Sequence, residues 1–240
     1  TELQNKINKK VVVGGVEAEM AIIGALTTPG TAKPLAIIDM GAGSTDASIM
    51  TTDGTIASCH LAGAGNMVTL LIDKELGINN LELSEDIKKY PLAKVESLFH
   101  IRHEDGSVQF FEEALNPSVF ARVVILKEGA MVPLDSNQSL EKIKNVRREA
   151  KEKVFVTNTL RALKKVIPSG NVRDIDYVVL VGGSALDFEI PQMVTEALSH
   201  FGVVAGKGNI RGVEGPRNAV ATGLALSYKG PDRIPLSFTW

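Results

Sequence analysis

The chain has 240 residues, 44% of them hydrophobic, which is enough for one large globular domain or two small ones with a proper core. Its 26 basic and 28 acidic residues give a net charge of −2, which argues against a nucleic acid or a polyanionic membrane as the main partner. No apolar run is long enough to cross a bilayer, and the single cysteine, Cys59, rules out an internal disulfide and fits a reducing compartment, so we expect a cytoplasmic protein.

The first 30 residues predict a linker, a strand and a helix. Residues 1–10 are polar and lysine-rich, and Val11-Val12-Val13 predicts a short buried strand. Residues 16–26 have helical composition, and Pro29-Gly30 ends the helix. Glu17 then lies in the first helical turn, where it is either a partner of the helix dipole or a carboxylate aimed at an attacking water or at magnesium.

Residues 35–60 predict a buried strand, a glycine-rich loop and a returning strand, followed by a hairpin turn at Asp53-Gly54. The loop is either a plain turn or a nest of backbone N–H groups that binds an oxyanion. Asp39 and Asp46 flank it, and magnesium takes carboxylate and phosphate oxygens as ligands. The loop consists of Gly41, Ala42, Gly43, Ser44 and Thr45.

Other sites are excluded around this loop. The sequence has neither the Gly-Lys-Ser/Thr of a Walker loop nor a helix directly after the glycines, as a dinucleotide fold would need. Cys59 falls in a predicted strand, which indicates a buried structural thiol rather than a nucleophile. The four histidines show no spacing typical of a zinc site.

The middle of the chain changes character after a second glycine loop, 61–66, and a helix over 67–76 that ends at Gly77. That loop either offers further N–H donors or is a plain connection. A short helix is expected from residue 83, with Ser84 as its N-cap, and Pro91 closes the segment. Residues 99–111 predict a hairpin, and 123–126 a further strand.

One long amphipathic helix is predicted over residues 140–167, bounded by Pro168-Ser169-Gly170. Its apolar residues recur close to the helical period. We expect its basic cluster to be a solvated face, a partner surface being the alternative. The cluster consists of Arg147, Arg148, Lys151 and Lys153.

The last third repeats the pattern of strand, glycines and helix. Residues 177–181 predict a strand that ends at Gly182-Gly183-Ser184, and 191–201 predict a helix. Tandem glycines after a buried strand let a flat ring or a phosphate approach the backbone closely. Residues 215–223 open a small-residue helix that could pack tightly on the sheet. These strands and helices predict an α/β domain carrying an α+β insertion.

Three of these features together resemble the second half of the actin-like (ribonuclease H-like) ATPase fold. The segment from Asp39 to Asp46 matches the second phosphate loop, residues 178–185 resemble the adenosine motif, and Glu17 sits where a connecting helix carries a catalytic glutamate. Glu85-x-x-Lys88-Lys89 repeats the spacing with which the seventy-kilodalton heat-shock chaperones grip adenosine. The resemblance implies a nucleotide-binding subdomain over 11–83 and 169–229, an inserted subdomain over 84–168 and a tail over 231–240.

A closer resemblance, over roughly residues 11–228, is to the large subunit of diol and glycerol dehydratase reactivating factors. The segments that carry it are GGVEAEMAIIGALTTPG, DMGAGSTDASIM, HLAGAGNMV, KKYPLAKVES, VLVGGSALDFEIPQ and GNIRGVEGPRNAVATGLAL. The resemblance implies a chaperone of a coenzyme B12 enzyme that uses ATP to release damaged cobalamin. Its implied partners are a small subunit and the dehydratase, with ADP favouring the tight complex. Diol versus glycerol dehydratase as client, and association with a bacterial microcompartment, stay open.

The resemblance also implies roles for single residues. Asp39 and Asp46 would hold Mg²⁺ and its waters, and Glu17 would position the attacking water. The phosphates of ATP or ADP would contact Gly41, Ala42, Gly43, Ser44 and Thr45. Adenosine would lie between Gly182, Gly183 and Ser184 on one side and Ser84, Glu85, Lys88 and Lys89 on the other.

One departure from this superfamily is that the sequence contains no first phosphate loop, and it begins with Thr1 rather than methionine. We therefore expect a C-terminal portion of a longer subunit that holds one wall of the nucleotide site. By itself it should bind nucleotide weakly and hydrolyse little ATP. Two other classes fit the same fold: a small-molecule kinase and a filament-forming actin relative.

Overall fold

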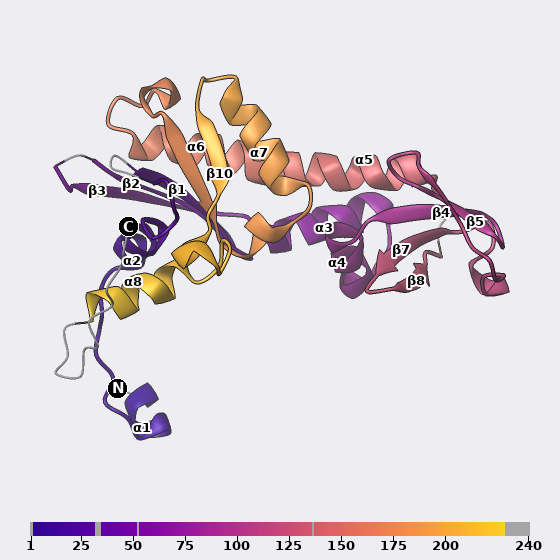
Figure 1. Cartoon of the computed structure of the whole chain (residues 1–240), viewed down its shortest axis with the longest axis horizontal. Helices are drawn as coiled ribbons and strands as arrows, with labels where there is room; N and C mark the ends of the chain where they lie inside the picture. Colours follow the sequence, from indigo (N-terminus) through magenta and orange to yellow (C-terminus); the bar gives the residue numbers. More distant parts are fainter. Residues whose placement is uncertain (1, 32–34, 52, 136, 229–240) are drawn as a thin grey trace.

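The computed structural model describes residues 2–31, 35–51, 53–135 and 137–228. They form two five-stranded sheets that lie at opposite ends of an elongated molecule and are connected by a long helix (Figure 1). The predicted tail, 231–240, falls outside the described residues. Within them, no helix is both long and apolar enough to span a bilayer.

The first sheet has the strand order β10-β9-β1-β2-β3. β1 pairs with β2 in antiparallel fashion, with Asp39 opposite Asp46, and with β9 in parallel. Since β1 is central and covered on both faces, it is a nearly continuous apolar run rather than an alternating one. The strands are β1 (Leu35–Met40), β2 (Ser44–Met50), β3 (Ile56–Ala62), β9 (Tyr177–Val181) and β10 (Val204–Lys207).

Successive residues of β1 enter two different cores because side chains alternate across a strand. Leu35 and Ile37 pack with α2 (Glu17–Ala25), whereas Ala36 and Ile38 pack with α6 (Thr157–Val166) and α7 (Ile190–Ser199). The predicted small-residue helix is α8 (Ala219–Ser227), and it packs against α2.

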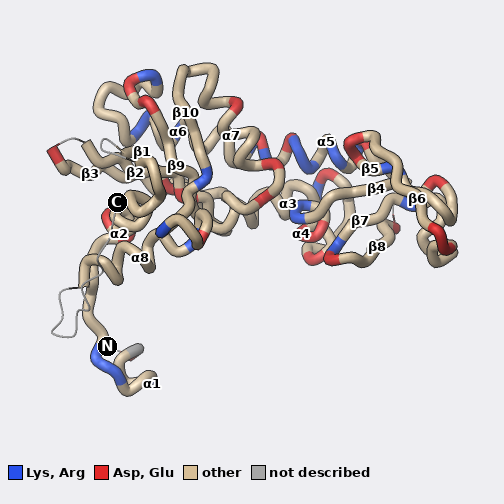
Figure 2. The backbone as a smooth tube through the Cα atoms, in the orientation of Figure 1, with Lys and Arg blue, Asp and Glu red and all other residues tan. Residues whose placement is uncertain are grey.

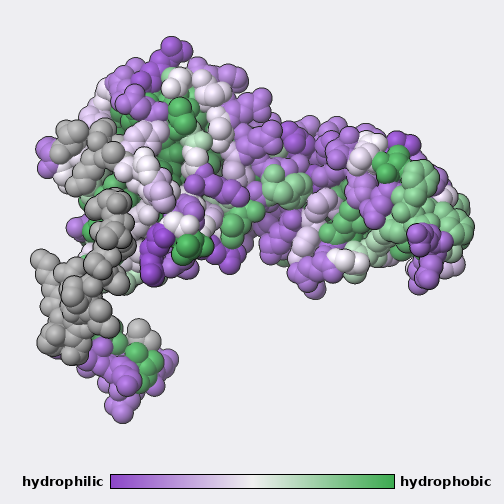
Figure 3. Space-filling view, in the orientation of Figure 1, coloured by the Kyte–Doolittle hydropathy of each residue, from purple (hydrophilic) through white to green (hydrophobic). Residues whose placement is uncertain are grey.

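The second sheet has the order β6-β5-β4-β7-β8, and all of its pairings are antiparallel. Its far end carries apolar side chains on the surface, and Phe99, Phe110 and Phe120 are each more than half exposed (Figure 3). Two helices, α3 and α4, lie between it and the first sheet (Figure 1). The elements are α3 (Gly65–Leu76), α4 (Leu81–Lys89), β4 (Leu92–Ser97), β5 (His100–His103), β6 (Val108–Phe110), β7 (Val123–Lys127) and β8 (Ala130–Pro133).

The predicted long helix is continuous but includes a π-helical segment. It consists of α5 (Leu140–Lys151), the π-helical Glu152–Val156, and α6, and Ser139 caps its start by accepting from the Lys142 N–H. α5 packs on β4 and α3, whereas α6 packs on β2 and β3. The predicted insertion therefore ends in a helix shared by both sheets, and the domain boundaries stay predictions. The remaining helical segments are α1 (Glu2–Ile7) and the 3₁₀ turns Pro117–Val119, Val172–Asp174, Gly183–Leu186 and Ile210–Gly212.

Two local predictions are wrong. Residues 11–13 form no strand, and Val12 and Val13 are 66% and 94% exposed. Three β-branched residues have strand propensity, but a strand needs a neighbour, which is a tertiary property. Ser84 does not cap α4, because the helix starts three residues earlier and Asn80 accepts from the Leu83 N–H. The sequence prediction took Ser84, which lies inside the helix, for the N-cap residue, whereas the N-cap is Asn80.

The contact between α2 and α8 depends on two glycines. A Cβ added to Gly24 would lie 1.8 Å from the Ala219 carbonyl oxygen, and one added to Gly223 would lie 1.9 Å from the Met20 carbonyl oxygen. Backbone atoms of the facing helix cannot move as a flexible side chain can. We therefore expect Gly24→Ala to lower the free energy of unfolding by about 3 kcal/mol or more, despite the better helix propensity of alanine.

Urea denaturation followed by circular dichroism measures this change. Gly206→Ala is the matched control, since a Cβ there has no neighbour within 4 Å. Its effect should stay within about 0.5 kcal/mol. Equal midpoints for the two variants would contradict the interpretation.

Candidate functional site

A cavity of about 420 Å³ brings together most of the residues that the sequence assigned to nucleotide. Its lining comes from the loop after β1, the start of α3, the end of α4 and the turn after β9. These segments are far apart in the sequence, and the fold collects them at one place between the two sheets. The lining residues are Gly41, Ala42, Gly65, Asn66, Glu85, Lys88, Lys89, Gly183, Ser184, Leu186, Asp187, Phe188, Ile190 and Arg217.

The two glycine loops bond to each other through their backbones. The N–H groups of Gly63 and Asn66 donate to the carbonyls of Gly43 and Ala42, at 2.9 and 2.8 Å. The N–H of Gly65 donates to the Gly41 carbonyl at 3.2 Å. These N–H groups of the second loop are thus engaged by the first loop. The loop at 61–66 therefore stabilises the predicted phosphate loop at 41–45 through backbone hydrogen bonds.

Gly182 is required at the end of β9 for two reasons. Its φ is +92°, and an added Cβ would lie 2.3 Å from Asp39 Oδ1 and 2.7 Å from the Met40 carbonyl oxygen. Its N–H donates to the Pro216 carbonyl at 2.9 Å. Only a glycine meets both demands, and it turns Gly183 and Ser184 toward the cavity.

Ser184 and two other predicted residues, Thr45 and Ser44, hold the loops in place through their side chains. Ser184 Oγ donates to the Gly41 carbonyl at 3.0 Å, across 143 residues of sequence. Thr45 is fully buried and donates to the Gly63 carbonyl, and Ser44 donates to Asp46 Oδ2 at 2.9 Å. Ser84 does not line the cavity, because its buried side chain donates to Asp73 Oδ1 at 2.9 Å.

The α4 residues Glu85, Lys88 and Lys89 line one side of the cavity, which we call the α4 wall. Glu85 is the centre of a small ionic cluster on this wall. Burial opposes its ionisation, but hydrogen bonds from Lys88, Lys89 and Thr69 outweigh this effect and lower the pKa of its carboxyl to about 2. Lys88 is only 8% exposed, and its ammonium group donates to Glu85, to Thr69 Oγ1 and to the Gly65 carbonyl. Its three donors are thus engaged. Lys89, whose side chain is 55% exposed, and the exposed Arg217 are cations that line the open cavity.

A second cavity, of about 190 Å³, is lined by the three predicted carboxylates. Burial, together with the charges of Asp46 and Glu17, raises the pKa of Asp39 to about 6. His60 Nδ1 lies 2.5 Å from Asp46 Oδ1. Cys59 lines the same cavity and is half-buried rather than fully buried.

This acidic group fits a magnesium ion in one respect. Asp39 is partly buried, and the charges of Asp46 and Glu17 also raise its pKa. A cation would be favoured beside these three carboxylates. Among the described residues, no group of three or more His, Cys, Asp or Glu side chains is arranged to hold a metal by itself. Magnesium held through one or two carboxylates, phosphate oxygens and waters needs no such group.

The basic residues of the long helix were assigned to its solvated face, and this is wrong for two of them. Arg147 and Lys151 are fully buried, whereas Arg148 and Lys153 are exposed. Figure 2 shows the alternation of basic and acidic residues along α5. A signal was present in the sequence: positions 147 and 151 share a helical face with the apolar Ile143 and Val154.

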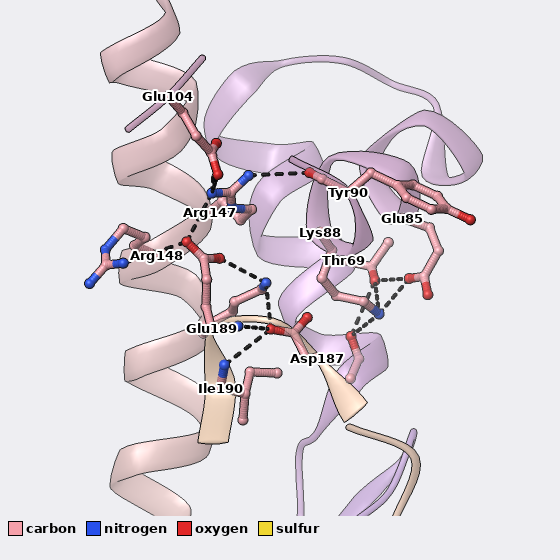
Figure 4. A network of polar contacts seen from close by, with 12 residues as sticks. Thr69, Glu85, Lys88, Tyr90, Glu104, Arg147, Arg148, Asp187, Glu189 and Ile190 are labelled. Atoms are coloured by element: carbon pink, nitrogen blue, oxygen red, sulfur yellow. Dashed lines mark hydrogen bonds and ion pairs between the residues drawn. The ribbon is translucent and has the colours of Figure 1, made fainter. Parts of the chain in front are cut away.

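Two acidic partners of these buried cations lie directly after the turn at Gly183–Leu186 (Figure 4). Arg147 and Lys151 bind Glu189, and Lys151 also binds Asp187. Sequence reasoning missed Asp187, Phe188, Asn66 and Arg217 as lining residues. Acidic residues just after a glycine motif could have suggested the first of these.

The comparisons with known proteins agree on one family. The chain matches "Diol dehydratase reactivase ATPase-like domain" over residues 1–228, and it belongs to that family. It is 65% identical over 227 residues to the diol dehydratase-reactivating factor large subunit of Klebsiella michiganensis and 66% identical over 227 residues to the propanediol dehydratase-reactivating factor large subunit of Citrobacter freundii. Each alignment covers 95% of this chain and 37% of the curated relative, so the chain spans little more than a third of their length.

Solved structures confirm the predicted fold class. A glycerol dehydratase reactivase superimposes with a TM-score of 0.87 and 70% identity, over 94% of this chain and 37% of that one. MreB5 of Spiroplasma citri bound to ADP superimposes with a TM-score of 0.54 and 22% identity, over 94% of this chain and 62% of that one. The chain therefore has the fold of the actin-like ATPases.

The raised pKa of Asp39 predicts a pH-dependent penalty on stability. The pKa of Asp39 in the folded state, about 6, lies above the ordinary carboxyl value of 3.8. Ionised Asp39 therefore destabilises the fold above about pH 6, and the penalty disappears as pH falls through 6 toward 4. We expect Asp39→Asn to raise the free energy of unfolding by about 1–3 kcal/mol at pH 7.5, with a smaller gain at pH 4.5.

Urea denaturation at the two pH values gives the difference. Glu113→Gln changes a carboxylate at an exposed loop position and serves as control. A gain for Asp39→Asn that is the same at both pH values would show that the effect does not come from the titration of Asp39.

Proposed function

We propose that this chain supplies one wall of an ATP or ADP site with Mg²⁺ in the large subunit of a diol or glycerol dehydratase reactivating factor. That factor would act as an ATP-dependent chaperone that releases damaged cobalamin from a coenzyme B12 enzyme. The observation that carries the proposal is the 420 Å³ cavity, in which the phosphate loop, the Glu85–Lys89 helix and the Gly183-Ser184 turn meet. The family's description as ATPase-like and the names of the relatives support it.

Within this proposal the residues divide by chemistry. Ala42 and Gly43 would face phosphate with their backbones, since the loop has no side chains that block approach. Asp39 and Asp46 would hold Mg²⁺ and its waters, a role for which the raised pKa of Asp39 is suited because a nearby cation favours the ionised carboxylate. Bound magnesium would neutralise phosphate charge. Glu17, in the first turn of α2, would orient the attacking water.

The adenosine end would lie near Lys89 and Gly183. Lys89 is the more exposed of the two α4 lysines, and Gly183 lines the same cavity without any atom within 4 Å of an added Cβ. Lys88 and Ser184 have their hydrogen-bonding groups engaged within the chain. They would hold the walls of the site rather than contact the ligand.

The proposed mechanism is a switch. Hydrolysis of ATP would change the affinity of the subunit for the dehydratase, with ADP favouring the tight complex. Linkage requires that nucleotide and partner shift the same conformational equilibrium, and that ATP and ADP shift it to different extents. The proposed partners are the small subunit of the factor and the dehydratase, in the cytoplasm, with no role for nucleic acid or a membrane.

This chain supplies only one side of the proposed nucleotide site, and it should bind nucleotide poorly without the other side. We expect this 240-residue polypeptide to bind MgADP far more weakly than the full-length subunit does and to hydrolyse no measurable ATP. Isothermal titration calorimetry and a phosphate-release assay on both proteins test this. Micromolar affinity with turnover by the shorter polypeptide would contradict the proposal.

The chaperone role is tested by capture of the client. Immobilised full-length subunit, loaded with its small subunit, should retain cobalamin-inactivated dehydratase in ADP and release it in ATP. The same column with bound subunit but no nucleotide measures background retention. Equal retention in ADP and in ATP would contradict a nucleotide-driven switch.

A further inference from the structure

Three residues after the Gly183–Leu186 turn form a wall of the nucleotide cavity, namely Asp187, Phe188 and Glu189. Asp187 and Phe188 line the cavity directly. Asp187 Oδ1 accepts from the N–H groups of Glu189 and Ile190, at 2.9 and 3.1 Å, and so starts α7. We call this segment the acidic wall.

Two buried cations of the long helix hold the acidic wall. Lys151 Nζ lies 2.8 Å from Asp187 Oδ1 and 2.8 Å from Glu189 Oε2. Arg147 Nη2 lies 2.8 Å from Glu189 Oε1. The ring of Phe188 lies against both, 4.5 Å from Lys151 Nζ and 4.9 Å from Arg147 Cζ, which is within the range of cation–π attraction.

Arg147 also binds residues outside the acidic wall, namely Tyr90 and Glu104 (Figure 4). Its Nη1 donates to the carbonyl of Tyr90, the residue that ends α4, at 3.4 Å. Its Nη2 binds both carboxylate oxygens of Glu104, at 3.0 and 2.9 Å, and Lys144 donates to the Glu104 carbonyl at 2.7 Å. One guanidinium therefore joins the acidic wall, the α4 wall and the hairpin of the second sheet.

Close ion pairing between buried groups fixes this arrangement. Two cations with no exposed area face the carboxylates of Glu104, Asp187 and Glu189, which are 13%, 7% and 7% exposed. Removal of one cation leaves a carboxylate buried without its partner, so the wall must move until that carboxylate reaches water. The position of the wall therefore depends on the two cations.

We propose that Lys151 and Arg147 are positioning residues of the nucleotide site: they set the distance between the acidic wall and the α4 wall without contacting the nucleotide. The inference rests on the proposed function. It differs from the contacts already assigned, because neither residue lines the cavity. It also makes Glu104, on the second sheet, a residue that acts on nucleotide binding through Arg147.

The test uses the full-length subunit and calorimetry with MgADP. Lys151→Met should raise the Kd about tenfold, and Glu104→Gln about threefold, because the wall is displaced. Lys153→Met is the matched control: it removes an exposed lysine two residues further along the same helix and should keep the Kd within about twofold of the wild-type value. In steady-state assays Lys151→Met should raise KM for ATP more than it lowers kcat, as expected for lost binding.

A second variant separates positioning from folding. Lys151→Met combined with Asp187→Asn removes one buried charge of each sign, because Lys151 is the cation that pairs with Asp187, so it should restore the thermal midpoint toward wild type while the Kd stays raised. If both Lys151→Met and the double variant bind MgADP as the wild type does, the inference is overturned. If the wild-type subunit itself does not bind MgADP, the proposed function fails instead.

Discussion

The arrangement of the two sheets depends on the ion pairs that two buried cations of α5, Arg147 and Lys151, form with acidic residues. A charged side chain without exposed area is costly unless its partners are close and well oriented, and both Arg147 and Lys151 have partners at 2.8 Å. Apolar contacts could hold the long helix against its neighbours in several registers. Fixed ion pairs to Glu104 and Glu189 are satisfied in one register, so they add specificity more than stability.

The phosphate loop is constrained by the same principle of close, directional contact. Its carbonyls accept from the second glycine loop and from Ser184, and Gly182 lies against Asp39. Each of these contacts joins segments that lie far apart in the chain. The loop geometry is therefore a product of the assembled fold. The raised pKa of Asp39 is a further result, since the fold buries its carboxyl and β1 and β2 place Asp46 opposite it.

Features with a local cause could be predicted from the sequence. The β1–β2–β3 unit follows from an apolar run, a glycine loop and Asp53-Gly54, and the end of α3 follows from Gly77, whose φ is +64°. The failures have tertiary causes. Residues 11–13 found no neighbouring strand, and Arg147 and Lys151 look like surface residues until their partners, about 40 positions away, are known. Most residues that were predicted to contact nucleotide line one cavity, because the motifs fix residue types and spacing, and the three predicted carboxylates line another. Ser84 and Thr45 are buried and bond within the chain, which the motif does not specify.

The acidic wall and the α4 wall pack against different sheets, so a ligand that changes the distance between the walls would also move one sheet relative to the other. The acidic wall leads into α7 on the first sheet, and the α4 wall is next to the second sheet. Arg147 binds both walls, and the helix that carries it packs on both sheets. A change in the distance between the walls therefore requires a change in this one set of contacts. A ligand shifts such an equilibrium only by its difference in affinity between two arrangements, so the side chains that fix the distance, rather than those that touch the ligand, determine how large that difference can be.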